Sequence, residues 1–289
     1  MTDRKVVVSG LGVIASCGIG TEAFWEGLCA SPPEGERRVV DFDPADYFDN
    51  PKDARRSDRS TQFAIAASQM ALEEAGQLTA ESDRSGVFIG TGIGGIETLE
   101  EQIEVLLEKG SRRVSPFLVP MMMPNAASAA VSMKYGFQGP AENTCTACAA
   151  GTHAIINASR LIASDRCDVV IAGGTESAFT GSSIAGFTNM TAFSSAGISR
   201  PFDLERDGFV MGEGAGILLL EEKEMAKARG ARIFAEILGG ASNADAHHIT
   251  APAPEGAGAK KCIELALKDS GVPIDQVGYI NAHGTSTPL

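Results

Sequence analysis

One stretch, residues 143–155, constrains the fold of this chain more than any other part of the sequence. It reads Asn-Thr-Cys-Thr-Ala-Cys-Ala-Ala-Gly-Thr-His-Ala-Ile. Apolar residues recur at helical spacing from Gly151 onward, whereas the first residues are typical of the end of a buried strand. The sequence therefore predicts a strand that runs directly into a helix, with Cys148 at or just before the first helical turn.

Cys148 is a candidate nucleophile because of this position. The unpaired N–H groups and the positive dipole end of a helix favour an anion at its N-terminus, and the thiolate is the nucleophilic form of cysteine. The neighbouring residues Ala147, Ala149, Ala150 and Gly151 are small, so a substrate has room to reach the sulfur. Acyl transfer is the chemistry that such a cysteine suits.

Other interpretations of Cys148 stay open at this point. A cysteine in an alanine-rich helix start is often a small buried hydrophobic residue. Cys145 and Cys148 also form a C-x-x-C pair, which is a redox or zinc signal. Zinc is disfavoured because no second pair follows. A thioredoxin-like site is disfavoured because it would place the first cysteine of the pair, not the second, at the start of the helix.

The rest of the chain has the pattern of an α/β protein, in which short apolar runs that end in glycine alternate with amphipathic segments. With 289 residues it forms one large domain or two closely packed ones. Strands are predicted at 6–14, 85–90, 167–174, 217–222, 233–238 and 277–282. Helices are predicted at 21–28, 61–75, 97–109, 125–133, 223–229 and 257–270. Gly186 and Phe187 fall in a Gly/Ser/Thr-rich segment that is predicted to be a loop.

Gly10, Gly12 and Ala15 imitate the G-x-G-x-x-A pattern of dinucleotide-binding sites. The next predicted helix begins only at Thr21, so its N-terminus is displaced from the place where a pyrophosphate would sit. We interpret Gly10 and Gly12 as turn glycines at the end of the first strand.

The charge of the chain excludes one class of function and suggests a kind of partner. The net charge is −13, which disfavours a general nucleic-acid binder. Within this acidic chain, Lys52, Arg55, Arg56 and Arg59 form the densest group of basic residues, here called the basic cluster. It is either a solvated helix face or a docking patch for an acidic partner.

The location of the protein is also an expectation from composition. No apolar run approaches the length of a membrane span. The six cysteines show no paired spacing pattern, and the chain begins without a signal peptide. We therefore expect a reducing, cytoplasmic environment and no membrane contact.

His283 is a second candidate for chemistry. The predicted strand 277–282 delivers it into Gly-Thr-Ser-Thr, whose small polar side chains leave space for a ligand. A histidine after a strand is more often a structural residue when it is considered alone. Together with Cys148, however, it fits acyl transfer by a cysteine–histidine pair.

Five segments of the sequence together resemble the β-ketoacyl-acyl carrier protein synthases. Within that family, the sequence is most similar to the type II, elongating enzymes. These segments are 146–155, 172–176, 200–203, 206–214 and 281–287, and the similarity runs in family order from Val6 to Leu289. The resemblance implies a thiolase-like fold, which is a five-layered α-β-α-β-α core of two similar halves. The halves are here 1–230 and 231–289, the second of them incomplete, and the family usually forms homodimers.

The resemblance also implies roles for individual residues. Cys148 would take the acyl chain from acyl carrier protein as a thioester, with its own backbone N–H in the oxyanion hole. His283 would stabilise the enolate that forms when the malonyl thioester loses carbon dioxide. Thr285 and Thr287 match positions that contact the phosphopantetheine arm, and Thr250 matches a residue at the mouth of the pocket. Ile93 and Phe187 match positions that line the acyl channel. The basic cluster matches the carrier-docking region. The resemblance implies no metal or redox cofactor, because decarboxylation supplies the driving force. Both substrates would be carried on the phosphopantetheine of acyl carrier protein.

The sequence departs from the family at its end. In the family, a lysine, a second active-site histidine and a glycine-rich turn follow the Gly-Thr-Ser-Thr segment, and none of them is in this sequence. We expect a fragment of a longer chain, with apolar residues exposed in its last part. The alternative is a short relative that binds acyl chains or carriers without condensing them. A polyketide ketosynthase is a nearer alternative.

Overall fold

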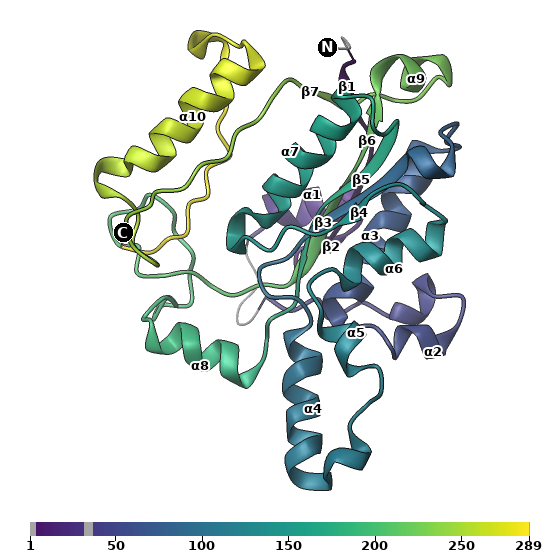
Figure 1. Cartoon of the computed structure of the whole chain (residues 1–289). Helices are drawn as coiled ribbons and strands as arrows, with labels where there is room; N and C mark the ends of the chain where they lie inside the picture. Colours follow the sequence, from purple (N-terminus) through teal and green to yellow (C-terminus); the bar gives the residue numbers. More distant parts are fainter. Residues whose placement is uncertain (1–3, 32–36, 289) are drawn as a thin grey trace. The chain divides into compact units, whose positions relative to one another are not determined.

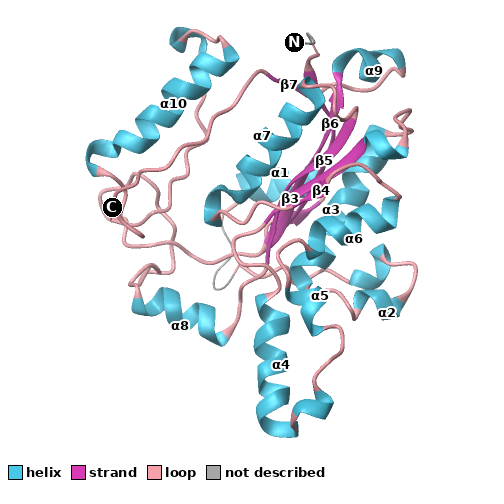
Figure 2. Cartoon of the chain, in the orientation of Figure 1, coloured by secondary structure: helices cyan, strands magenta, loops and turns pink. Residues whose placement is uncertain are grey.

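The computed structural model describes residues 4–31 and 37–288. By their contacts, the residues form two compact units. The first consists of Met1–Phe187 and Met211–Glu236, and the second of Thr188–Val210 and Ile237–Leu289. Figure 1 labels the elements along the chain, and Figure 2 colours them by type. The predicted halves, 1–230 and 231–289, follow the family resemblance and stay a prediction.

The first unit is built on one mixed sheet. Its strands lie in the order β2-β1-β6-β5-β3-β4, and β7 pairs with β1 as well. β3 and β5 are parallel, whereas β6 runs antiparallel to both of its neighbours, β5 and β1. The strands are β1 Val6–Ala15, β2 Gly18–Ile19, β3 Ser85–Gly90, β4 Ala141–Glu142, β5 Val169–Glu176, β6 Gly214–Glu222 and β7 Ala235–Ile237.

Helices cover both faces of this sheet. α3 and α6 pack on one face and α7 on the other, so the first unit has three layers, α-β-α (Figure 1). The first-unit helices are α1 Thr21–Cys29, α2 Pro51–Ala54, α3 Arg59–Ala75, α4 Ile96–Lys109, α5 Leu118–Met122, α6 Ala126–Tyr135, α7 Ala150–Ala163 and α9 Lys223–Ala228. Helix α8, Gly181–Asn189, crosses from the first unit to the second, and α10, Ala257–Ser270, belongs to the second.

Gly10 and Gly12 lie inside β1, so our interpretation of them as turn glycines is wrong. A Cβ atom on Gly12 would lie 1.8 Å from the carbonyl oxygen of Ala67, and one on Gly10 would lie 2.0 Å from that of Ala71. Both alanines belong to α3. The two glycines therefore allow the backbone of α3 to approach β1 closely, and the strand continues past them to Ala15.

A single buried carboxylate fixes the start of two helices. One oxygen of Asp58 accepts a hydrogen bond from the backbone N–H of Ser60 in α3 at 3.0 Å. The other accepts from the backbone N–H of Thr98 in α4 at 3.1 Å. Helix N-termini leave N–H groups without partners inside the helix, and a capping carboxylate satisfies them. Asp58 thereby joins two helices that are far apart in the sequence.

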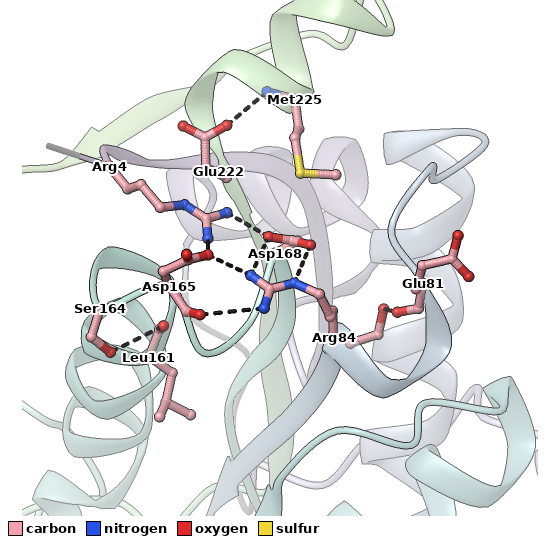
Figure 3. Close-up of polar contacts among 10 residues, drawn as sticks. Arg4, Glu81, Arg84, Leu161, Ser164, Asp165, Asp168, Glu222 and Met225 are labelled. Carbon is pink, nitrogen blue, oxygen red and sulfur yellow. Dashed lines mark hydrogen bonds and ion pairs between the residues drawn. The ribbon is translucent and has the colours of Figure 1, made fainter. Parts of the chain in front are cut away.

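Ion pairs join the beginnings of three strands at one end of the sheet (Figure 3). Arg4 precedes β1, Arg84 precedes β3, and Asp165 and Asp168 precede β5. Arg84 bonds to both aspartates, and Arg4 does the same. At the same end, the Glu222 carboxylate accepts a hydrogen bond from the N–H of Met225 and caps α9.

Three local predictions are wrong. Residues 277–282 form no strand, because a strand needs hydrogen-bonded neighbours and the described part of the second unit offers them no partner strand. Gly186 and Phe187 lie in helix α8, not in a loop. The strand before Cys148 is only the two-residue β4, which is exposed at the edge of the sheet and not buried.

The last part of the chain carries exposed apolar side chains, as expected from the sequence. They are Leu238, Ile263, Ile274, Val277, Tyr279 and Ile280. Among the described residues, no helix has the length and the run of apolar side chains that crossing a membrane needs.

Candidate active site

Cys148 is an exposed free thiol on a sharp turn at the start of α7. Residues Ala147–Ala149 form a single 3₁₀ turn that leads directly into the 14-residue helix. Ala147 has a φ of 51°, in the left-handed region that residues other than glycine rarely adopt. Strained backbone of this kind clusters at functional sites. The predicted helix start is confirmed, and the turn presents the thiol to solvent.

Hydrogen bonds to the end of β3 hold the segment that leads to this turn. The Asn143 side chain donates to the carbonyl oxygen of Ile89 at 2.6 Å, and the N–H of Thr91 donates to the carbonyl oxygen of Thr144 at 3.1 Å. The Cys145 thiol donates to the carbonyl oxygen of Gly92 at 3.4 Å. The turn is therefore attached to the sheet and to the loop that follows β3.

Glycines bring the start of α7 unusually close to the sheet. A Cβ atom on Gly90 would lie 2.4 Å from the carbonyl oxygen of Ala150. One on Gly174 would lie 3.1 Å from the Cα atom of Gly151. Larger residues at these positions would push the helix away from β3 and β5. Gly151 and Gly174 stand inside motifs that are recognisable in the sequence, but the contacts that these glycines permit became clear only from the structure.

Glu176 is a polar residue of this region that we did not single out from the sequence. It ends β5 and is half-buried. Its carboxylate accepts hydrogen bonds from the N–H of Gly92 at 2.7 Å and from the Thr91 hydroxyl at 3.2 Å. Burial raises the pKa of Glu176 above its ordinary value, and these hydrogen bonds oppose that effect. The only signal in the sequence was its place at the end of the 172–176 motif.

The predicted acyl-channel residues both lie in the first unit, as Cys148 does. Ile93 follows β3 in the loop that Glu176 binds, and its side chain is 42% exposed. Phe187 is half-buried in α8. The structure thus places Ile93 on the loop that is hydrogen-bonded to the cysteine segment.

His283, Thr250, Thr285 and Thr287 belong to the second unit. His283 is exposed, and so is Thr250, whose N–H donates to Nδ1 of His248 at 3.2 Å. The hydroxyls of Thr285 and Thr287 are 2.7 Å apart. Because Cys148 lies in the first unit, its pairing with His283 stays a prediction.

The Gly-Thr-Ser-Thr segment is anchored by the 200–208 region of the same unit. The N–H of Arg200 donates to the Ser286 hydroxyl at 2.8 Å, and the N–H of Gly208 donates to the Ser286 carbonyl oxygen at 2.8 Å. The Arg206 side chain donates to the carbonyl oxygen of Thr287 at 3.0 Å. Three motifs that looked separate in the sequence, 200–203, 206–214 and 281–287, are therefore joined to one another, and Ser286 is buried among them.

The basic cluster divides into two kinds of residue. Lys52, Arg55 and Arg56 are exposed. Arg59 instead bonds to both carboxylate oxygens of Glu213, at 3.0 and 2.8 Å, and the side chain of Glu213 is fully buried. Burial alone would raise the pKa of Glu213, but hydrogen bonds from Arg59 and others hold it below its ordinary value. Arg59 thus has a structural partner inside the protein.

An apolar groove of about 580 Å³ lies beside the exposed part of the basic cluster. Met121 and Met123 line it, together with Phe48, Phe117 and Met133. The Arg56 guanidinium, which also lines the groove, stacks 4.3 Å from the centre of the Phe117 ring. Two of the three successive methionines at 121–123, Met121 and Met123, therefore contribute to a surface groove.

Comparison with known families identifies the class of this protein. Residues 33–226 match the family described as "Beta-ketoacyl synthase, N-terminal domain", and residues 234–289 match "Beta-ketoacyl synthase, C-terminal domain". The chain belongs to the β-ketoacyl synthase family, and its fold is the thiolase-like α/β fold of the ketosynthases, as predicted.

Individual relatives agree with this assignment. The chain is 47% identical to the 3-oxoacyl-[acyl-carrier-protein] synthase 2 of Synechocystis sp., over 99% of this chain and 74% of the relative. A β-ketoacyl synthase structure from Burkholderia phymatum matches with a TM-score of 0.85 and 32% identity, covering 98% of this chain and 74% of that one. A ketosynthase in complex with a type II polyketide acyl-carrier protein matches with a TM-score of 0.88 and 33% identity, over 99% and 74%.

Proposed function

We propose that this chain carries the acyl-binding cysteine of a 3-oxoacyl-[acyl-carrier-protein] synthase of type 2, an elongating condensing enzyme of fatty-acid synthesis. The observation that carries the proposal is Cys148, an exposed thiol on a strained turn that opens directly into α7. Membership of the β-ketoacyl synthase family and the name of the Synechocystis relative support the same reaction.

In the first half-reaction, the Cys148 thiolate attacks the thioester carbonyl of an acyl-carrier protein. The carbon–sulfur bond to phosphopantetheine breaks, its thiolate takes up a proton, and the acyl chain is left on Cys148. The tetrahedral oxyanion receives a hydrogen bond from the backbone N–H of Cys148. No described side chain caps α7, so its N-terminal dipole also acts on this charge.

In the second half-reaction, His283 hydrogen-bonds the thioester carbonyl of the malonyl-carrier protein. The carbon–carbon bond to the carboxylate breaks, carbon dioxide leaves, and His283 stabilises the enolate. The enolate carbon attacks the acyl thioester, and the Cys148 thiolate leaves as the β-ketoacyl product forms. Thr285 and Thr287 bind the phosphopantetheine arm, and their hydroxyls already lie within hydrogen-bond distance of each other.

Three further proposals concern the partners and the location of the protein. Acyl carrier protein docks on Lys52, Arg55 and Arg56, because these exposed cations attract an acidic partner, and the polyketide relative was solved with its carrier. The chain forms a homodimer, for which the exposed strand β4 at the edge of the sheet offers a surface for pairing. The protein works in the cytoplasm.

The test is the intact mass of the protein after incubation with a long-chain acyl-carrier protein. We expect a mass increase equal to one acyl group, and no increase for Cys148→Ala. Cys145→Ala is the matched control, because Cys145 is also an exposed free thiol within the same stretch, and this variant should still acylate. An acyl adduct that persists in Cys148→Ala would overturn the assignment of the nucleophile.

Two alternatives predict different outcomes. A polyketide ketosynthase, which the solved complex favours, would elongate a poly-β-keto chain in preference to a saturated chain. A non-condensing relative would bind acyl-carrier protein but release no carbon dioxide from malonyl-carrier protein. Saturated-chain elongation with release of carbon dioxide would exclude both.

A further inference from the structure

Glu176 holds the loop after β3 through a connected set of hydrogen bonds. Its carboxylate accepts from the N–H of Gly92 at 2.7 Å and from the hydroxyl of Thr91 at 3.2 and 3.3 Å. The Thr91 hydroxyl in turn accepts from the N–H of Gly94 at 3.1 Å and from that of Ile93 at 3.4 Å. A hydroxyl has one proton, so donating it to Glu176 directs the oxygen lone pairs toward these two N–H groups.

This loop is also in contact with the segment that carries Cys148. The N–H of Thr91 donates to the carbonyl oxygen of Thr144, and the Cys145 thiol donates to that of Gly92. A Cβ atom on Gly92 would lie 2.9 Å from Oε2 of Glu176 and 3.7 Å from the Cα atom of Ala147. Gly92 is therefore close both to the carboxylate and to the residue that immediately precedes Cys148.

We propose that Glu176 is a positioning residue for acyl-chain binding, which it controls by fixing the loop that carries Ile93. This inference rests on the proposed function, in which Ile93 lines the acyl channel. Among the described residues, the Glu176 carboxylate bonds to Thr91 and Gly92, with further backbone contacts at Ile93 and Ser177, and Cys148 is not one of its partners. The effect of Glu176 on the substrate is therefore exerted through Ile93. Binding of an acyl chain that is long enough to pass Ile93 should depend on Glu176, whereas binding of a shorter acyl chain should not.

Glu222 offers a matched control for this role. It also ends a strand, β6, and its carboxylate also accepts a backbone N–H bond, from Met225 at 2.8 Å. It lies at the other end of the sheet, where its own N–H pairs with the carbonyl oxygen of Asp168. Removing either carboxylate leaves backbone groups without a partner, but only the loss of Glu176 disturbs the loop next to Cys148.

The experiment measures transfer to Cys148 from carriers loaded with a short and a long saturated acyl chain. In Glu176→Ala, we expect the KM of the long-chain substrate to rise about tenfold, because the loop loses its hydrogen bonds to a charged group. The KM of the short-chain substrate should change less than about threefold. Glu176→Gln keeps an acceptor oxygen and should restore most of the long-chain KM. Glu222→Ala should lower the melting temperature without changing the ratio of the two KM values.

Thr91→Ala is a second variant in case Glu176→Ala does not fold. It removes the hydroxyl but keeps the bond from Gly92 to the carboxylate, so the ratio should shift in the same direction by a smaller factor. Unchanged ratios in folded Glu176→Ala or Thr91→Ala would overturn the positioning role while leaving the proposed function intact. A wild-type protein that alkylates with iodoacetamide but never acylates would overturn both, because the nucleophile would be present without its substrate.

Discussion

Arg84 and Asp168 face each other in a two-point ion pair at the end of the sheet (Figure 3). Nε of Arg84 donates to Oδ2 of Asp168 at 2.6 Å, and Nη2 donates to Oδ1 at 2.8 Å. Arg4 bonds to the same carboxylate. The hydrogen bonds from Arg84, more than any other contact, lower the pKa of Asp168. The starts of β1, β3 and β5 are therefore joined through one carboxylate.

This relationship predicts how stability depends on pH. The lowered pKa of Asp168 means that the unfolded state binds its proton first as the pH falls. The contribution of the pair is fully present above about pH 4, the ordinary aspartate range, and is lost as the pH falls through the lower folded value. Urea unfolding between about pH 2.5 and about pH 7 should show this loss in the wild type and not in Asp168→Asn.

Asp168→Asn should lower the free energy of unfolding by about 1–2 kcal/mol at pH 7, since Arg84 is partly exposed and solvent weakens the pair. Asp165→Asn is the control, because the Asp165 side chain is 52% exposed. That change should cost less than about 1 kcal/mol. Equal losses for the two variants, or parallel pH curves for wild type and Asp168→Asn, would show that the carboxylate of Asp168 has no special role.

The shared cap at Asp58 predicts a loss larger than that of an ordinary helix cap. Asp58→Ala removes the acceptor for both α3 and α4, and each cap is worth about 1 kcal/mol. Because the site is buried, the N–H groups that lose their acceptor cannot form hydrogen bonds to water instead. We therefore expect urea unfolding to show a loss of about 2–3 kcal/mol in the free energy of unfolding. Asp43→Ala removes the cap of one short 3₁₀ turn. If it cost as much as Asp58→Ala, the double cap would not explain the effect.

The strained turn at Ala147 predicts that stability and activity respond differently to one substitution. Ala147→Gly relieves a left-handed conformation that costs about 1–2 kcal/mol, and the added freedom of glycine offsets about 0.5–1 kcal/mol of this gain. The free energy of unfolding should rise by no more than about 1 kcal/mol. Acylation of Cys148 should slow by about tenfold, because the more mobile turn holds the thiol less well.

Ala154→Gly is the control for that substitution. Ala154 is fully buried inside α7, so glycine there should lower the free energy of unfolding by at least about 1 kcal/mol. Thermal unfolding and the acylation rate from intact mass measure both effects. A marked loss of stability in Ala147→Gly would mean that the left-handed turn is not strained.

Local patterns in the sequence predicted the elements well, because each reports on its own neighbours. The amphipathic segment 257–270 is α10 with the same bounds, and 61–75 lies within α3. The helix start at Cys148 followed from the change in periodicity after Gly151. Contacts between distant segments were not predictable in this way. Nothing near Gly12 in the sequence indicated that the carbonyl oxygen of Ala67 would come so close that a Cβ atom on Gly12 would lie 1.8 Å from it.

The candidate site shows the same division between local and distant information. The cysteine and the motifs around it were visible in the sequence, and the family they resemble is confirmed. The partner of Arg59 was not visible, because Glu213 is 154 positions away and no local pattern connects them. The predicted strand 277–282 failed for a related reason. Its apolar pattern is strand-like, but a strand exists only with neighbours to pair with.

The division of the basic cluster predicts opposite effects for neighbouring arginines. Arg55→Glu and Arg56→Glu should weaken binding of acyl carrier protein at low salt by about tenfold each, because both side chains are exposed and attract an acidic partner. Their effect on the free energy of unfolding should stay within about 1 kcal/mol, including the loss of the Arg56–Phe117 contact. Raising the salt concentration should reduce the difference in binding.

Arg59→Ala should behave in the reverse manner. It leaves the buried carboxylate of Glu213 without its cation, which costs about 3 kcal/mol in the free energy of unfolding. Carrier binding by the folded fraction should be unchanged, since the Arg59 guanidinium already bonds to Glu213 and to the carbonyl oxygen of Val39. Isothermal titration with carrier protein, paired with urea unfolding of each variant, separates the two roles. If Arg59→Ala weakened binding as much as Arg56→Glu without loss of stability, the docking surface would include Arg59.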